Sequence, residues 1–172
     1  FTIFDPEERA WADIFLANGA PVNIKVTTTM GADNASSKKG VYYALTGKLY
    51  TGSESWPVYL EALDKNLMDT DKDYYFLVVN KTTGKVFWNS IKGLSSLTPN
   101  GSNPPFQVVW KNNNQFIEKS FEDTRKLVMG TFFETLNKRA EPRDIAEGLE
   151  CFSDVSNTFK YIQTEPSAEQ LF

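Results

Sequence analysis

The stretch that decides the fold is ADIFLANGAPVNIKVT, residues 12–27. Apolar and polar residues alternate on both sides of Asn18-Gly19, the dipeptide most typical of a tight hairpin turn. We therefore expect two antiparallel strands joined at that turn. Alternation with a period of two places Asn23 and Lys25 on one face of the second strand and its aliphatic residues on the other. If Asp13 pairs near Asn23, an acid, an amide and an amine lie side by side on a rigid sheet.

The spacing of these polar residues resembles a known motif. In the PD-(D/E)xK nuclease motif, an acid at the end of one strand is followed by a hairpin and then by acid-x-Lys on the next strand. Asp13, about ten residues of hairpin and then Asn23-Ile24-Lys25 resemble this motif. The following segment, 27–47, contains ADN at 32–34 and YYALTG at 42–47 and resembles type II restriction endonucleases of that superfamily. The resemblance covers roughly residues 9–145. Two positions depart from it: Ala12 stands where the family usually has Pro, and Asn23 where it has a second acid.

The resemblance implies a Mg²⁺-dependent, sequence-specific endodeoxyribonuclease that cuts double-stranded DNA as a homodimer. It makes Asp13, Asn23 and Lys25 the catalytic residues, with Asp13 and Asn23 as the ligands of Mg²⁺. Mg²⁺ prefers carboxylate and water oxygens, polarises a scissile phosphate and lowers the pKa of the attacking water. Lys25 would orient that water or stabilise the developing charge. Asp33 and Glu8 are the nearest acids that could compensate for the missing charge at Asn23.

Two other interpretations stay open. An amide ligates Mg²⁺ through its oxygen but brings no charge, so Asn23 is also consistent with a catalytically weakened DNA-binding module that keeps the nuclease fold. The third possibility is a non-enzymatic interaction domain, in which the hairpin is amphipathic and its polar residues are merely solvated.

Composition limits the class of protein. A chain of 172 residues suits one domain, 1–172, with a real hydrophobic core. The chain has no histidine, which excludes a Ser-His-Asp triad, an HNH-type nuclease and any zinc site that uses histidine. A lone cysteine, Cys151, and the lack of a long apolar run or signal peptide favour a cytoplasmic protein without a membrane segment. The chain starts at Phe1 rather than Met, which is consistent with a missing N-terminal helix.

Charge is distributed unevenly along the chain. The net charge is −4, yet residues 81–126 hold 7 basic and only 3 acidic side chains, and local positive potential is what neutralises phosphates. Two polar stretches, 31–40 and 93–115, contain the Ser, Asn, Gln and Lys residues that typically contact DNA. Both stretches also have the composition of surface loops. The predicted DNA-binding residues are Asp33, Asn34, Ser36, Lys38, Lys39, Asn103, Gln107, Lys111, Asn112 and Asn114.

The rest of the chain predicts an α/β fold. Residues 41–45 are expected to be buried in a helical turn or a short strand. Ser55 and Pro57 predict a helix start, and 74–79 and 85–91 predict two strands, the first buried on both faces. Ser120, with Asp123 three residues later, predicts the cap of a long helix that ends before Pro142. We expect a restriction-endonuclease-like core, with a mixed sheet of about four or five strands flanked by helices and a peripheral tail at 143–172.

Overall fold

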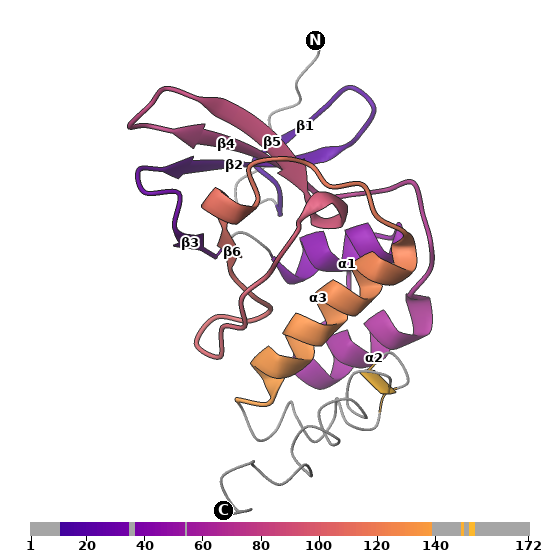
Figure 1. Cartoon of the computed structure of the whole chain (residues 1–172). Helices are drawn as coiled ribbons and strands as arrows, with labels where there is room; N and C mark the ends of the chain where they lie inside the picture. Colours follow the sequence, from indigo (N-terminus) through magenta and orange to yellow (C-terminus); the bar gives the residue numbers. More distant parts are fainter. Residues whose placement is uncertain (1–10, 35–36, 54, 139–148, 150–151, 154–172) are drawn as a thin grey trace, which may run out of the picture.

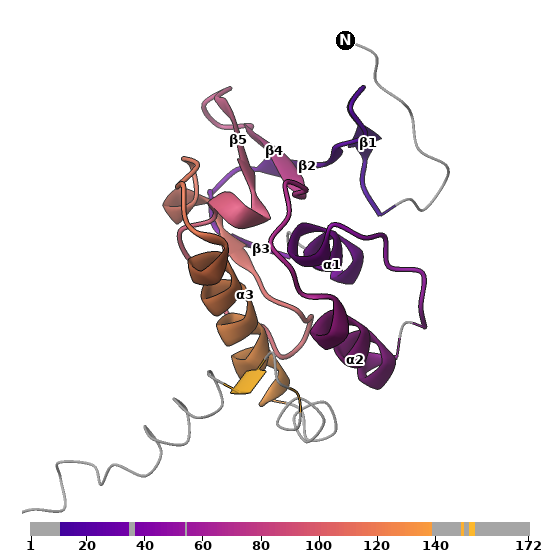
Figure 2. The ribbon, with the colours of Figure 1, turned by 90° about the vertical axis from the view of Figure 1, so that its right-hand side faces the viewer.

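The computed structural model describes residues 11–34, 37–53, 55–138, 149, 152 and 153. The fold is mixed α/β, with a four-stranded sheet at one end and three α-helices beneath it (Figure 1). Turning the molecule shows that all three helices lie on the same side of this sheet (Figure 2). No helix in the described part of the chain is long and apolar enough to cross a membrane.

The main sheet has the strand order β1-β2-β4-β5. β1 (Ile14–Phe15) is antiparallel to β2 (Pro21–Thr27), β2 is parallel to β4 (Tyr75–Asn80), and β4 is antiparallel to β5 (Val86–Ser90). The predicted mixed sheet is therefore confirmed. Parallel neighbours need a long crossover connection, and the crossover between β2 and β4 contains two helices, α1 and α2.

The two crossover helices begin where the sequence places start signals. α1 (Lys38–Thr46) is capped by the Ser37 hydroxyl, which accepts a hydrogen bond from the Gly40 N–H at 3.0 Å. Residues 41–45 are thus helical, which decides between the two alternatives left by the sequence. α2 (Trp56–Asn66) starts after Ser55, as predicted, although the Ser55 side chain makes no capping hydrogen bond.

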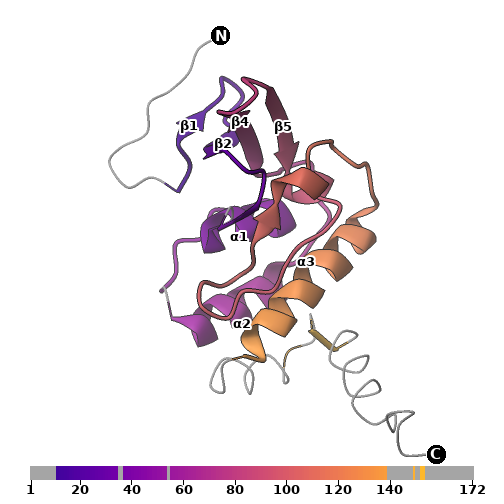
Figure 3. The same ribbon diagram turned by 60° about the vertical axis from the view of Figure 1, so that its left-hand side comes forward.

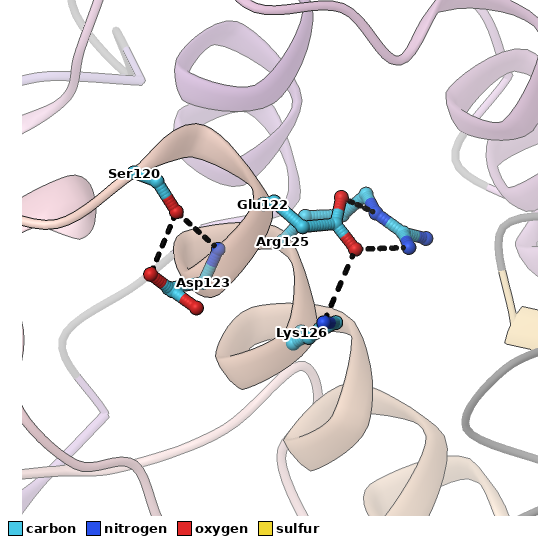
Figure 4. A network of polar contacts seen from close by, with 5 residues as sticks. All are labelled: Ser120, Glu122, Asp123, Arg125 and Lys126. Carbon is cyan, nitrogen blue, oxygen red and sulfur yellow. Dashed lines mark hydrogen bonds and ion pairs between the residues drawn. The ribbon is translucent and has the colours of Figure 1, made fainter.

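The third helix, α3 (Phe121–Leu136), is capped as its sequence predicts (Figure 4). The Ser120 hydroxyl accepts from the Asp123 N–H at 3.0 Å and lies 2.6 Å from the Asp123 carboxylate. Glu122 forms a bidentate pair with Arg125, with N–O distances of 2.9 and 3.0 Å. Two acids in the first turn also complement the helix dipole.

A second, two-stranded sheet joins β3 (Ala32–Asp33) to β6 (Val108–Val109). The Thr27 hydroxyl ends β2 by accepting the Met30 N–H at 3.0 Å, and Met30 has a φ of 56°. β2 therefore ends at Thr27, although the β-branched run continues through Thr29. Two 3₁₀ turns complete the fold, η1 (Ile91–Gly93) and η2 (Trp110–Asn112).

The core lies between the helices and one face of the main sheet. Phe76 and Val78 on β4 and Trp110 on η2 are fully buried there. The opposite face of the sheet is not covered by any described residue over much of its area, because Ile24 and Trp88 remain 41% and 54% exposed. One expectation is therefore wrong: residues 74–79 are not buried on both faces. The described helices flank one face of the sheet.

Candidate functional site

The hairpin turn places the first candidate residue. Leu16 O accepts the Gly19 N–H at 2.8 Å, and the Leu16 N–H donates to Ala20 O at 3.0 Å. Gly19 has a φ of +79°, so the loop is a turn followed by a left-handed residue rather than the two-residue turn typical of Asn-Gly. Beyond the last register pair, Ile14↔Val22, Asp13 hydrogen-bonds to Val22 and Ile24, the two neighbours of Asn23. The expected proximity of Asp13 to Asn23 in the hairpin is confirmed.

Asp13 is attached to the strand that carries the other two residues. Its backbone N–H donates to Val22 O at 3.0 Å, and its Oδ2 accepts the backbone N–H of Ile24 at 2.6 Å. A carboxylate that accepts a backbone N–H loses rotational freedom and forms a charge-assisted hydrogen bond. The side chain stays exposed to solvent. Asp13 is thus both held in position and accessible.

Asn23 presents an unusual oxygen. Its Oδ1 is buried, and no donor among the described residues lies within hydrogen-bonding distance of it. Buried polar atoms are normally paired, and leaving one unpaired costs about 1–3 kcal/mol. An amide oxygen that lacks a donor is available as a ligand for a cation.

Lys25 follows Asn23 by two residues on β2, so both side chains are on the same face of the strand. This is the face toward the helices, where both side chains are partly buried. The ammonium donates to the backbone carbonyl of Asn34 at 3.4 Å. That contact joins the lysine to the segment between β3 and α1.

Tyr74 lies near Asp13 and Asn23, and nothing in its apolar run singles it out. Its hydroxyl donates to Trp11 O at 2.9 Å, and its ring stacks on Trp11 with 5.6 Å between centroids. Burial, with a smaller contribution from the nearby Asp13 charge, raises the pKa of Tyr74 to about 12, while the Ser37 and Asn23 side chains lower it. Tyr74 is therefore neutral and acts as a support for this site.

A close approach holds α1 against this support. A Cβ atom added at Gly40 would lie 2.9 Å from the Tyr74 ring, so only glycine permits the contact. The N-terminus of α1 is thereby held near Tyr74, and its first turn contains no acidic residue. A helix N-terminus carries a partial positive charge that favours phosphate.

The oxygens of Asp13 and Asn23 are of the types that Mg²⁺ prefers as ligands. Mg²⁺ commonly uses one or two protein oxygens together with waters and substrate phosphate. One Asp13 oxygen is used by Ile24, and the other accepts no hydrogen bond from the described residues. Within those residues there is no cluster of three or more His, Cys, Asp or Glu side chains placed to hold a metal. The available ligand set is therefore one carboxylate and one amide.

Some of the predicted DNA-contacting residues meet beside Lys25. Asn34 Oδ1 accepts from Gln107 Nε2 and from Asn100 Nδ2, both at 3.0 Å. These residues come from the connection after β3 and from the segment before β6. Asn100 was not predicted, although it lies in the same Asn-, Gly- and Pro-rich stretch. Asn103 is exposed, and its N–H donates to Asn100 Oδ1 at 3.4 Å. We call Asn34, Asn100 and Gln107 the amide cluster.

Two other predicted residues have structural contacts. Asp33 Oδ2 accepts from the indole N–H of Trp110 at 3.2 Å, which joins β3 to the core. The Lys38 ammonium lies 3.8 Å from the centre of the Trp56 ring. Lys39 follows in the first turn of α1, whereas Ser36 and Glu8 lie outside the described residues.

The remaining predicted residues lie at the other end of β2. The Lys111 N–H donates to Met30 O at 2.8 Å, and Asn112 O accepts from the Ser95 hydroxyl at 2.7 Å. Asn114 lines a shallow hollow of about 270 Å³ that also contains Lys85. Between them, Asn113 is fully buried, with its side chain hydrogen-bonded to backbone atoms on both sides. The polar run 111–115 therefore mixes a structural residue with exposed ones.

A buried acid outside this site also escaped prediction. Asp73 is 7% exposed at the start of β4, and its Oδ1 accepts the Tyr74 N–H at 2.7 Å. Burial raises the pKa of Asp73 to about 6, although the Ser90 side chain, the Tyr74 backbone and the Lys92 charge lower it. An acidic run such as 69–73 is typical of a solvated connector, but Asp73 in it is buried.

A scan of protein-family models gave no match to this chain, and a search of curated proteins found no similar sequence.

Proposed function

We propose that this protein is a Mg²⁺-dependent, sequence-specific endodeoxyribonuclease that hydrolyses phosphodiester bonds in double-stranded DNA, as type II restriction enzymes do. The observation that supports this proposal is the grouping of Asp13, Asn23 and Lys25 on adjacent strands. A carboxylate, an unpaired amide oxygen and an ammonium group are then available to one phosphate.

Each residue has a distinct role in this proposal. Asp13, held by the Ile24 N–H, and Asn23, through its unpaired oxygen, hold the metal ion. When bound there, Mg²⁺ supplies Lewis-acid polarisation of the phosphate and lowers the pKa of water at the site. Lys25 stabilises the negative charge that develops on the phosphate oxygens, or orients the attacking water. Its contact with Asn34 O directs the ammonium along the rim of the site.

The amide cluster gives this site a means of reading sequence. Asn and Gln side chains hydrogen-bond adenine with donor and acceptor together, and the cluster lies next to the proposed catalytic lysine. Lys111, Asn112 and Asn114, one strand length away, are proposed to contact the DNA backbone. A palindromic target with two half-sites would be cut on both strands by a homodimer.

One observation favours a second candidate function, DNA binding without cleavage. Asn23 supplies no negative charge, and the oxygen that would hold the metal is already largely enclosed. A chain of this kind would keep the contacts to DNA and lose the chemistry.

Incubation with mixed unmethylated plasmid and phage DNA, in Mg²⁺ and in EDTA, tests the proposal. Discrete bands that require Mg²⁺ support a sequence-specific nuclease. Intact DNA that nevertheless binds the protein, with an affinity that falls steeply with salt, supports the second candidate. Intact DNA with no binding contradicts both.

A further inference from the structure

The outer face of the main sheet is mostly apolar. Three rows of side chains cross β2, β4 and β5 in register: Val22 beside Tyr75 and the buried Ser90, Ile24 beside Leu77 and Trp88, and Val26 beside Val79 and Val86. None of these residues carries a charge. The helices cover the other face, as Figure 3 also shows. We call this set of residues the outer face.

Much of the outer face is open to solvent. Ile24, Val26, Val86 and Trp88 are 41%, 50%, 57% and 54% exposed, whereas Phe76 and Val78 on the helix side are fully buried. Trp88 stands between the Tyr75 and Phe116 rings, with centroids 6.3 and 5.3 Å away, and Phe116 is itself 41% exposed. A charged ladder is the usual protection of an open sheet, and here it is absent. An apolar surface this continuous marks a contact with another molecule.

The outer face also contains a hollow. A hollow of about 430 Å³ lies between the β1–β2 hairpin and Trp88, and it is lined mainly by apolar side chains that include Leu16 and Leu77. Raised and hollowed regions therefore lie next to each other on one patch. A surface of this kind can be complementary to itself across a two-fold axis.

We infer that a second copy of this chain covers the outer face, so that two sheets pack face to face in a symmetric dimer. The exposed apolar area agrees with such a dimer. Five apolar side chains that are each about half exposed provide on the order of 500 Å²: Ile24, Val26, Val86, Trp88 and the adjacent Phe116. They would form the apolar centre of a standard interface, which buries roughly 800 Å² per partner. DNA is a poor occupant, because the face offers no cation to phosphate. The inference does not rest on the proposed nuclease function. Asn23 and Lys25 lie on the opposite face of the sheet, so this pair is distinct from a homodimer that would cut both strands of one DNA site.

The test is the mass of the full chain in solution, measured by sedimentation over a range of concentrations up to tens of micromolar. We expect twice the chain mass for the wild type. The double variant Val26→Lys/Val86→Lys, at two half-exposed positions of one row, should have the mass of a single chain. The matched control, Leu49→Lys/Val58→Lys, adds the same charge at positions that are 61% and 46% exposed outside the outer face, and should remain a dimer. Melting curves of both variants show whether they are folded.

Every other result overturns the inference. If the wild type has the mass of one chain, a second copy does not cover the outer face. Co-sedimentation of that wild type with anionic vesicles, lost in Val26→Lys/Val86→Lys, would identify a lipid surface as the occupant. A folded Val26→Lys/Val86→Lys variant that dimerises as well as the control places the interface elsewhere. A mass that keeps growing with concentration indicates open association rather than a closed pair.

Discussion

Asp13 Oδ2 accepts the backbone N–H of Ile24 at 2.6 Å, across the two strands of the first hairpin. The bond connects the acid to the strand that also carries Asn23 and Lys25. Because it fixes one oxygen of the carboxylate and leaves the other for a ligand, the three polar side chains keep a defined spacing.

Replacing Asp13 by Asn removes the negative charge but keeps the hydrogen bond to Ile24. The amide oxygen of Asp13→Asn still accepts the Ile24 N–H, so we expect the free energy of unfolding to change by no more than about 1 kcal/mol. Loss of the carboxylate proposed as a metal ligand should lower Mg²⁺-dependent cleavage on the order of 100-fold or more. Thermal melting and cleavage rates measure the two effects. Asp71→Asn, at a highly exposed acid, is the control that should cleave normally. Equal cleavage by Asp13→Asn and wild type would remove Asp13 from the site.

Restoring a charge at Asn23 should tighten metal binding. Asn23→Asp gives the site a second carboxylate, so we expect half-maximal cleavage at roughly 10- to 100-fold lower Mg²⁺. Without Mg²⁺, two neighbouring carboxylates should lower the free energy of unfolding by about 1–3 kcal/mol, and Mg²⁺ should restore it. A Mg²⁺ titration followed by cleavage and by melting measures both. The same change at the exposed Asn18, whose side-chain oxygen accepts the Ala20 N–H as an aspartate oxygen also can, serves as the control. If the Mg²⁺ dependence of Asn23→Asp is that of the wild type, Asn23 is not a ligand.

The raised pKa of Asp73 predicts how the free energy of unfolding depends on pH. Its pKa is about 6 in the folded protein and near 3.9 in the unfolded chain, so the folded state binds more protons between these values. The free energy of unfolding therefore falls as the pH rises from about 4 to 6, by at most roughly 3 kcal/mol from this group. Asp73→Asn stays neutral and should lose this contribution. Melting temperatures at pH 5 and 7.5 should differ less in Asp73→Asn than in the wild type. An unchanged difference would show that another group is responsible.

Gln107 and Lys111 should affect DNA binding in different ways. Gln107→Ala removes a member of the amide cluster, so it should cost about 1–3 kcal/mol of discrimination between sequences and leave the salt dependence of binding unchanged. Lys111→Ala should weaken binding to all sequences and reduce the salt slope by about 0.9. Affinities for cognate and random duplexes at several salt concentrations distinguish the two effects. If both variants behave alike, the proposed division between base and backbone contacts is wrong.

Local patterns were enough to predict much of this fold. Alternation around Asn18-Gly19 predicted the hairpin and the proximity of Asp13 to Asn23, and Ser120 with Asp123 predicted the start of α3. Each of these features depends on residues that are close in the sequence. The same pattern separated the polar and aliphatic faces of β2.

Features that depend on tertiary packing were not predictable. Periodicity shows that β2 has two different faces but not which one the helices cover, and here the helices cover the face of Asn23 and Lys25. The continuous apolar run 74–79 is typical of a strand buried on both faces. The sequence of a single strand does not show whether neighbouring elements cover one of its faces or both. The contacts of Asn34 with Asn100 and Gln107 span 66 and 73 residues, so no local signal reveals them.

The most direct test of the proposed nuclease is single-turnover cleavage of plasmid DNA by the wild type and by Lys25→Met. The account predicts Mg²⁺-dependent cleavage by the wild type and a rate on the order of 100- to 1,000-fold lower for Lys25→Met, because a charge that stabilises the transition state is lost. Lys65→Met, at an exposed lysine on α2, should cleave at the wild-type rate. Cleavage by Lys25→Met at the wild-type rate, or no cleavage by the wild type in Mg²⁺, would contradict the account.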